Sequence, residues 1–145
     1  MIHIKLRPAT FEDSERLLAW RNDAQTRAAS INTDEVPREA HERWLRGILE
    51  SETRRLFIAE RDGVPVGTVR LDDISAGAEM SWTVAPDFRR QGVGEAIVKL
   101  ARINGGTVAR IKSENVASLK IAERAGLKRA GFGAPIDGDL ELWTL

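Results

Sequence analysis

The sequence predicts a mixed α/β fold, in which a central sheet of parallel and antiparallel strands is flanked by about four helices. Strand-like apolar runs outnumber helical ones, as in folds where hairpins and crossover helices share one sheet. The turn signal Asp62-Gly63 joins two apolar runs directly, which indicates an antiparallel hairpin. Helical patterns separate other runs, which indicates crossover connections.

The N-terminal part of the chain predicts one strand followed by two helices. Apolar and polar residues alternate over 2–7 and Pro8 ends the run, which indicates a strand. Thr10 and Asp13 have the spacing of a capping box, so we expect a helix to begin there. Polar residues over 21–32 indicate the end of this helix and a loop. Apolar residues at helical spacing over 37–49 predict the second helix.

The rest of the chain predicts six strands and two further helices. The expected strands cover 56–59, 64–71, 78–84, 108–111, 127–132 and 140–144, and the expected helices cover 96–103 and 117–125. The resulting order is β-α-α-β-β-β-α-β-α-β-β. No linker or internal repeat interrupts it, so we expect a single domain over 1–145.

Composition excludes several classes of protein. Lys+Arg 22 and Asp+Glu 22 balance to a formal net charge of +0, which argues against a nucleic-acid binder. The sequence has no cysteine and two histidines, so we expect no disulfide, no cysteine nucleophile and no metal site. No apolar run reaches membrane-spanning length and the N-terminus lacks the apolar core of a signal peptide. We therefore expect a cytoplasmic protein without a membrane partner.

A basic, glycine-rich turn, Arg89-Arg90-Gln91-Gly92-Val93-Gly94-Glu95, lies between the predicted strand 78–84 and the helix that follows it. Glycines let the backbone approach a phosphate, and the N–H groups of a first helical turn point at it. Arginines add charge-assisted donors. The turn lacks the Lys-Ser/Thr of a Walker loop and the third glycine of a dinucleotide loop. It predicts an anion site of another kind, the alternative being a helix cap with surface arginines.

The turn matches the pattern Arg/Gln-x-x-Gly-x-Gly/Ala. With the order of elements, it resembles the GNAT superfamily of acetyl-CoA-dependent N-acetyltransferases over nearly the whole chain. The resemblance implies the GNAT fold, acetyl-CoA as co-substrate and a pyrophosphate held by the turn. The cofactor-binding residues that it implies in the turn are Arg89, Arg90, Gln91, Gly92, Val93, Gly94 and Glu95.

A second motif, Asn115-Val116-Ala117-Ser118 followed by Ala125-Gly126-Leu127, resembles the late GNAT motif. The resemblance implies that Asn115 and Ser118 contact the pantetheine arm of the cofactor. The alternative is that Asn115 only caps the helix. The sequence departs from the family at Ala122, where many members have a tyrosine that protonates the departing thiolate. No tyrosine occurs in the chain, so Ser118, water or no dedicated acid must serve.

The reaction itself needs a proton acceptor and an oxyanion donor. Glu79 begins the predicted central strand, about where several GNAT enzymes place a catalytic glutamate, and we expect it to act as the general base. The alternative is an ordinary carboxylate at a strand edge. The resemblance further implies that the Val84 N–H, with Thr83 beside it, receives the thioester carbonyl at a bulge that parts two strands.

The acceptor side is expected in the N-terminal half. The segments 20–23 and 39–44 resemble the GNAT branch that acetylates UDP-linked 4-amino-sugars in pseudaminic-acid-type pathways. The resemblance implies that Arg21, Asn22 and His41 bind the acceptor, and an arginine-containing loop would suit a sugar-nucleotide diphosphate. The alternatives are that His41 is packed within the protein and that Arg21 is a solvated surface charge.

The identity of the acceptor stays open at this point. The late motif also resembles, less closely, the branch that acetylates ribosomal-protein N-termini, so a UDP-amino-sugar, a protein N-terminus and another small amine are all alternatives. A non-catalytic acetyl-CoA-binding module and a plain nucleotide-binding domain are alternatives of other classes. The apolar strand at the C-terminus would serve either a monomer or a homodimer.

Overall fold

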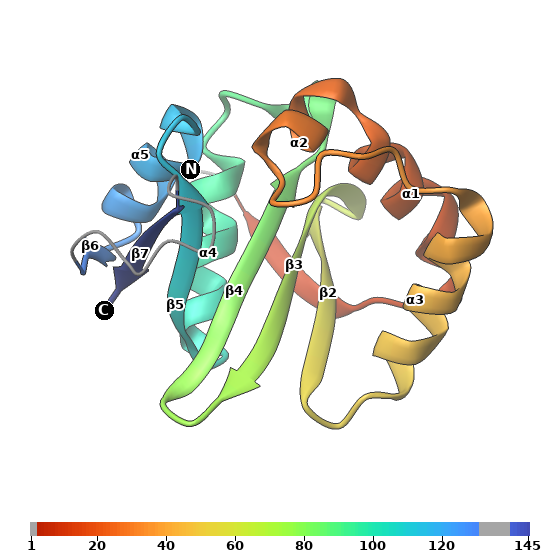
Figure 1. Ribbon diagram of the computed structural model, residues 1–145, viewed down its shortest axis with the longest axis horizontal. Coiled ribbons are helices and arrows are strands. Elements are labelled where there is room, and N and C mark those ends of the chain that lie inside the picture. Colours follow the sequence, from red (N-terminus) through yellow and green to blue (C-terminus); the bar gives the residue numbers. More distant parts are fainter. Residues whose placement is uncertain (1–2, 131–139) are drawn as a thin grey trace.

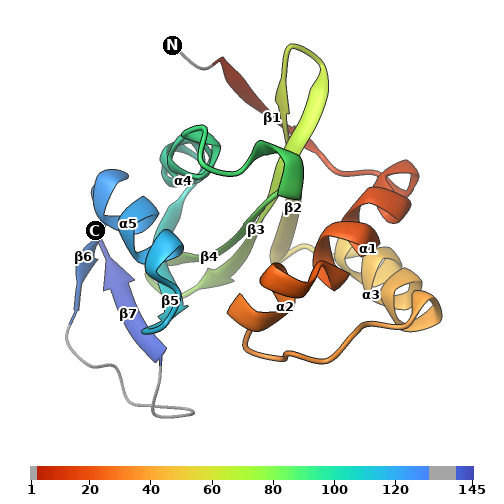
Figure 2. The same ribbon diagram turned by 90° about the horizontal axis from the view of Figure 1, so that it is seen from above.

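The computed structural model describes residues 3–130 and 140–145. Within these residues the chain forms a seven-stranded sheet in the order β1-β2-β3-β4-β5-β7-β6. The neighbours β4 and β5 are parallel, and the other neighbouring strands are antiparallel. Helices cover both faces of the sheet (Figure 1, Figure 2). The predicted mixed α/β fold is therefore confirmed.

The strands lie close to their predicted positions. Their bounds are β1 Ile4–Pro8, β2 Arg54–Arg61, β3 Val64–Ile74, β4 Gly77–Val84, β5 Gly106–Lys112, β6 Lys128–Arg129 and β7 Leu140–Thr144. The predicted Asp62-Gly63 turn joins β2 to β3, with both residues at positive φ (52° and 80°). The predicted strand 127–132 corresponds to β6, and its last two residues lie outside the described residues.

The helices differ from the prediction at one place. The bounds are α1 Ser14–Asn22, α2 Ala24–Ala29, α3 Arg38–Glu50, α4 Val93–Ile103 and α5 Val116–Arg124, with short 3₁₀ turns at Phe11–Asp13 and Pro86–Phe88. The described residues thus hold five α-helices rather than about four. The loop predicted over 21–32 was wrong in part, because Asp23 accepts a hydrogen bond from the Thr26 N–H and caps α2.

Two apolar clusters hold the helices to the sheet. On one face α4 buries Ile97, Val98 and Ala101 against β3, β4 and β5. On the other face α3 buries Leu45 and Ile48 against β2 and α1. Figure 2 shows α4 and α5 on one side of the sheet and the α1–α3 group on the other. The sheet therefore separates the molecule into two halves with separate cores.

The parallel pair β4–β5 is incomplete. Its register covers only Ala78 with Gly106 and Glu79 with Val108. Beyond that point the two strands diverge toward their carboxyl ends (Figure 1). Carboxyl ends of parallel strands lie at one edge of a sheet, where ligands bind in open α/β sheets. The β4–α4 turn and the start of α5 both follow these ends, so they flank the same opening.

Candidate active site

A cavity of about 480 Å³ opens where β4 and β5 part. This volume lies within the usual range for a small-molecule site. Segments from both halves of the protein line it. The lining residues are Leu17, Trp20, Arg21, Ala29, Ser30, Ile31, Asn32, Val36, His41, Trp44, Leu56, Thr68, Arg70, Met80, Ser81, Trp82, Thr83, Arg110, Ile111, Asn115 and Ser118. The cavity thus joins the β4–β5 opening to the space beneath α1 and α3.

The glycine-rich turn has the backbone geometry of an anion site. Gly92 is the N-cap of α4 and adopts the left-handed conformation, with φ 79°. A residue with a side chain would be strained in this conformation, and glycine has no side chain that could cap the helix. The first N–H groups of a helix have no intrahelical acceptor, so those of Val93, Gly94 and Glu95 are available to a ligand. Backbone donors and the helix dipole thus converge at this turn.

Gly94 is needed for close packing as well. A Cβ built at this residue would overlap Ile121 Cδ1 of α5 and lie 3.3 Å from Val84 Cγ2. The small residue therefore lets α4, α5 and the end of β4 meet. This contact keeps the turn beside the opening between β4 and β5.

The side chains of the turn are engaged within the protein. Arg89 binds Asp23 at the start of α2 and also donates to Gln25 and Thr26. The Gln91 side-chain oxygen accepts from Arg61 at 3.2 Å. These contacts tie the turn to the acceptor half and to β2.

Arg90 and Glu95, predicted with these residues to bind the cofactor, have different surroundings. Arg90 has φ 62°, a conformation uncommon for a residue with a side chain. Glu95 pairs with Lys99 one helical turn later, at 3.3 Å. The turn as observed offers backbone donors to a ligand more directly than it offers charged side chains.

The end of β4 presents the predicted oxyanion donor to the opening. The Ala85 N–H donates to the Val66 carbonyl of β3, at 2.9 Å. Because successive N–H groups of a strand point to opposite sides, the Val84 N–H points away from β3 and toward the gap. Thr83 lines the cavity beside it.

The expected bulge near Val84 is absent from the β3–β4 ladder, which runs without a shift from Gly67–Val84 to Ile74–Gly77. The register shift lies instead in the β4–β5 ladder, where the consecutive residues Ala78 and Glu79 pair with Gly106 and Val108, so that the extra residue is Thr107 of β5. The strands part because the β4–β5 ladder ends there, and not at the predicted bulge near Val84.

Glu79, the predicted general base, lies at the closed end of the opening. Its Oε2 pairs with Arg110 Nε at 2.5 Å, and the carboxylate side chain is largely buried. Arg110 lines the cavity, whereas Glu79 is not among the residues that line it. Strand alternation puts Glu79 on the same face of β4 as Ser81 and Thr83, which do line the cavity. The carboxylate therefore lies one side chain behind the cavity wall.

The start of α5 forms the wall opposite β4. Asn115 is the N-cap of α5 and its side-chain oxygen accepts from the Ser118 N–H at 3.2 Å. The capping alternative is therefore observed, and both residues also line the cavity. Ala122, one turn further on, is completely buried in the main core. Its methyl group cannot donate a proton, so Ser118 carries the nearest hydroxyl on this helix.

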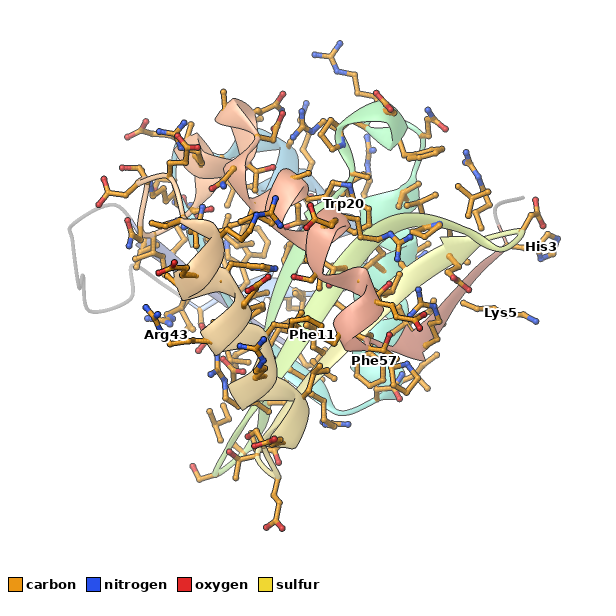
Figure 3. The ribbon with its side chains drawn as sticks, turned by 90° about the vertical axis from the view of Figure 1, so that its right-hand side faces the viewer. His3, Lys5, Phe11, Trp20, Arg43 and Phe57 are labelled. Atoms are coloured by element: carbon orange, nitrogen blue, oxygen red, sulfur yellow. The ribbon has the colours of Figure 1, made fainter. Side chains whose placement is uncertain are left out.

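The three predicted acceptor residues have different roles. Arg21 lines the cavity, and its Nη2 donates to the Asn32 carbonyl at 2.7 Å. Asn22 does not line it: its side-chain amide donates to the Val36 carbonyl and accepts from the Val36 N–H. Asn22 therefore holds the loop 30–36 against α1, and its role in binding the acceptor stays a prediction. Figure 3 looks onto this half, where α1 carries Trp20 beside α3.

His41 is buried, as the packed alternative anticipated, yet it borders the cavity. Its Nε2 donates to the Ser14 carbonyl at 3.0 Å, because a carbonyl can only accept. Burial lowers the pKa of His41 and outweighs the Ser14 bond, which raises it. The ring is therefore neutral at neutral pH and links α3 to the start of α1.

Several cavity residues escaped the sequence analysis. Arg70 and Arg110 reach the cavity from β3 and β5, and Trp44 and Trp82 enclose it from α3 and β4. Strand alternation relates Ser81 to Glu79 and to Thr83, which was predicted, and that signal could have added Ser81. No local pattern identifies Arg70 or Arg110, because only the sheet order brings them together.

Comparison with known proteins identifies the family. The family model described as the acetyltransferase (GNAT) domain matches residues 3–128. The chain belongs to the GNAT family of acetyltransferases. This GNAT domain is accordingly an acyltransferase, as predicted. A search of curated proteins found no match to the chain.

Solved structures agree with this assignment. A ribosomal-protein-alanine N-acetyltransferase from Brucella melitensis is 26% identical, with a TM-score of 0.75 and coverage of 97% of this chain and 98% of that one. A spermidine N-acetyltransferase from Vibrio cholerae, in complex with CoA and spermine, is 17% identical, with TM-score 0.83 and coverage of 98% and 94%. A domain from Methanocaldococcus jannaschii DSM 2661 is 22% identical, with TM-score 0.83 and coverage of 100% and 99%.

Two of these proteins are named for chemically different substrates, a ribosomal-protein alanine and spermidine. The two at or below 22% identity show the shared fold alone. None of the helices that the structure describes is long and apolar enough to cross a bilayer.

Proposed function

We propose that this GNAT domain transfers the acetyl group of acetyl-CoA to a primary amine, by direct attack of the amine in a ternary complex. One observation carries the proposal. A single cavity runs from the opening between β4 and β5 to an arginine-containing space beneath α1 and α3. Such a cavity admits a thioester from one side and an amine from the other.

The residues present fit the expected cofactor. The left-handed Gly92 and the unbonded first-turn N–H groups of α4 suit a pyrophosphate. The N-cap of α5, Asn115, with Ser118 one turn along, lies across the opening from Ser81 and Thr83 and suits the pantetheine arm. Acetyl-CoA, when bound, supplies an activated acetyl thioester, and everything else in the reaction falls to this chain's own groups.

The Val84 N–H supplies the proposed oxyanion donor. It points into the gap that β5 leaves when its ladder with β4 ends. A fixed backbone donor of this kind strengthens as negative charge develops on a carbonyl oxygen. The side chain of Thr83 lines the cavity beside this donor, where we expect it to contact the cofactor.

Proton transfer falls to Glu79 and Ser118. An amine similar to lysine has a pKa of about 10.4 and must lose a proton before it attacks. Because Arg110 stands between Glu79 and the cavity, we propose that Glu79 accepts this proton through a water. The leaving thiol, with a pKa of about 8.5, needs little help at neutral pH, and Ser118 is the hydroxyl nearest to serve.

We propose a UDP-linked 4-amino-sugar as the acceptor to test first. The arginines of the cavity support it, since guanidinium groups suit a diphosphate. A protein N-terminus or another small amine is the alternative, supported by the similarity to the ribosomal-protein-alanine N-acetyltransferase at 26% identity. A non-catalytic acetyl-CoA-binding module is the alternative of another class, supported by alanine at position 122.

Calorimetric titration of acetyl-CoA tests the proposal, together with an assay of CoA release on a broad amine panel. We expect micromolar binding and acetylation of at least one amine. Gly92→Glu should abolish binding, because its side chain would occupy the cradle and strain a backbone at φ 79°. Gly63→Glu is the matched control, since Gly63 has φ 80° at an open turn that does not line the cavity.

Each other outcome has a definite meaning. Binding without transfer to any amine would support the non-catalytic module. The absence of binding to folded wild-type protein would overturn the proposal as a whole. Equal loss in both glycine variants would show that backbone strain, and not the cradle, governs binding.

A further inference from the structure

Three arginines line the cavity, and no Asp or Glu is among its lining residues within the described chain. Two of the arginines pair with carboxylates, although Asp72, the partner of Arg70, also binds Arg54. Arg70 Nε lies 3.1 Å from Asp72, and Arg110 Nε lies 2.5 Å from Glu79. The third arginine, Arg21, has no carboxylate partner among the described residues. The described lining of the cavity therefore carries a net positive charge, to which Arg21 contributes without a compensating carboxylate.

The donors of Arg21 are also incompletely satisfied. Nη2 donates to the Asn32 carbonyl, but Nη1 is buried and meets no acceptor among the described residues. Burial lowers the pKa of Arg21, and the neighbouring charge of Arg27 lowers it further. No carboxylate offsets either effect. Buried polar groups without partners are rare in folded proteins, and each one calls for an explanation.

Trp82 of β4 also has a buried donor without an acceptor among the described residues. Its indole Nε1 can only donate, and it is buried without an acceptor within the described part of the chain. Trp82 and Arg21 come from opposite halves of the protein and line the same cavity. Because Trp82 also packs against the core on the α4 side, the unsatisfied guanidinium of Arg21 is the observation that points to a ligand with acceptor atoms.

We propose that the acceptor amine carries an anionic group, a carboxylate or a phosphate, and that Arg21 binds this group. The inference rests on the proposed acetyl transfer, because it concerns the amine that enters the same cavity. A guanidinium forms strong charge-assisted bonds with either anion after a small rotation of its side chain. A polycation such as a polyamine would meet three guanidinium groups and no carboxylate in the wall.

Paired amines test the charge requirement in wild-type protein. Amino acids are compared with their methyl esters, and a UDP-4-amino-sugar with the free amino-sugar; spermidine and an aminoglycoside represent cationic amines. We expect the anionic member of at least one pair to have the higher kcat/KM, by roughly tenfold to a hundredfold, as for loss of one charge-assisted bond. The two pairs also distinguish a carboxylate ligand from a diphosphate ligand.

The variant Arg21→Gln tests whether Arg21 binds the anionic group of the acceptor. We expect KM for the anionic amine to rise roughly tenfold to a hundredfold with kcat little changed, and KM for its neutral partner to stay the same. Arg21→Lys should give a KM for the anionic amine between those of wild type and Arg21→Gln, since lysine keeps the positive charge but lacks the paired donors of a guanidinium. Arg27→Gln is the matched control: Arg27 also donates to the loop, at the Thr33 carbonyl, but does not line the cavity.

The outcomes separate this inference from the proposed function. Acetylation of cationic amines alone, or of no amine by a protein that still binds acetyl-CoA, overturns the inference. Equal effects of Arg27→Gln and Arg21→Gln also overturn it, because both would then act by loosening the loop. Failure of wild-type protein to bind acetyl-CoA overturns the proposed function first. Melting temperatures of all variants show whether each remains folded.

Discussion

The two halves of this GNAT domain form their sites in different ways. In the cofactor half, which comprises β4, the turn 85–92, α4, β5 and α5, the proposed site consists of the backbone N–H groups of Val93, Gly94, Glu95 and Val84. In the acceptor half, which comprises α1, α2, the loop 30–36 and α3, the site consists of side chains. The first depends on where the backbone turns, and the second on which residues tertiary contacts bring together.

This difference explains why the family was easier to identify than the substrate. A backbone site needs glycines at fixed spacing, so it leaves a short pattern in the sequence. A side-chain site can be built from many residue types on the same scaffold, and relatives with one fold act on different amines. The contrast between the halves also leads to four predictions, which differ in the size of the expected effect.

The largest effect is expected at the boundary between the halves. If Glu79 is the base, Glu79→Gln should lower kcat by ~10²–10⁴ while acetyl-CoA binding stays unchanged. Asp72→Asn is the control, because Asp72 lies opposite Glu79 in the β3–β4 ladder and also binds arginines, Arg54 and Arg70, but does not line the cavity. Steady-state kinetics and calorimetry make the comparison. Near-wild-type turnover of Glu79→Gln would remove Glu79 from the mechanism.

The acceptor half should be the more sensitive to acid. Burial raises the pKa of Asp13, but bonds from Arg7, Arg16 and the Thr10 N–H outweigh it and lower that pKa from 3.8 to about 2. A lowered carboxyl pKa stabilises the fold fully above the unfolded value, and this contribution is lost as pH falls from about 4 through about 2. We expect a loss of about 2 kcal/mol, measured by denaturant unfolding at a series of pH values.

Two variants make this acid sensitivity specific. Asp13→Asn should reduce the pH dependence between 4 and 2 and lower stability at neutral pH, because Arg7 would lose its main partner. Glu15→Gln is the control, since the pair of Glu15 with Arg38 is exposed and should contribute little. A pH profile that is unchanged by Asp13→Asn would assign the acid sensitivity to other groups.

Replacing a helical glycine with alanine should change the stability of the protein in opposite directions in the two halves. A Cβ at Gly47 of α3 would meet nothing within 4 Å, so Gly47→Ala should stabilise by about 0.5–1 kcal/mol. A Cβ at Gly94 of α4 would overlap Ile121, so Gly94→Ala should destabilise by about 1 kcal/mol or more. Urea unfolding midpoints of both variants test this. Stabilisation by both changes would show that α4 and α5 can separate at little cost.

The smallest effect concerns the link between the halves. Asp23 binds Arg89, and this pair lowers the pKa of Asp23. A double-mutant cycle with Asp23→Asn and Arg89→Gln should give a coupling of about 0.5–1 kcal/mol, since the pair is partly buried. Asparagine keeps the cap on the Thr26 N–H. The cycle for Glu95 and Lys99, both within α4, is the comparison, and coupling no larger than in that exposed pair would show that Arg89 does not join the halves.

The sequence predicted most elements because their signals are local. The heptad-like apolar spacing of 37–49, the turn at Asp62-Gly63 and the glycines after α4 each act within a few residues. It missed α2, because six residues without a buried side chain carry no periodic signal, and only the Asp23 cap distinguishes them from a loop. It expected β4 and β5 to part near Val84, whereas their ladder ends at Glu79, because strand pairing is not a local property.

The sequence by itself determined the GNAT fold, the cradle at Gly92 and the lack of a tyrosine acid, because each depends on residue types at short spacing. Only the tertiary structure decided which arginine stays unpaired. Arg21, Arg70 and Arg110 are alike in the sequence, but the sheet places Asp72 and Glu79 beside two of them and none beside the third. Charge compensation depends on distance in space, and that distance is set by strand order.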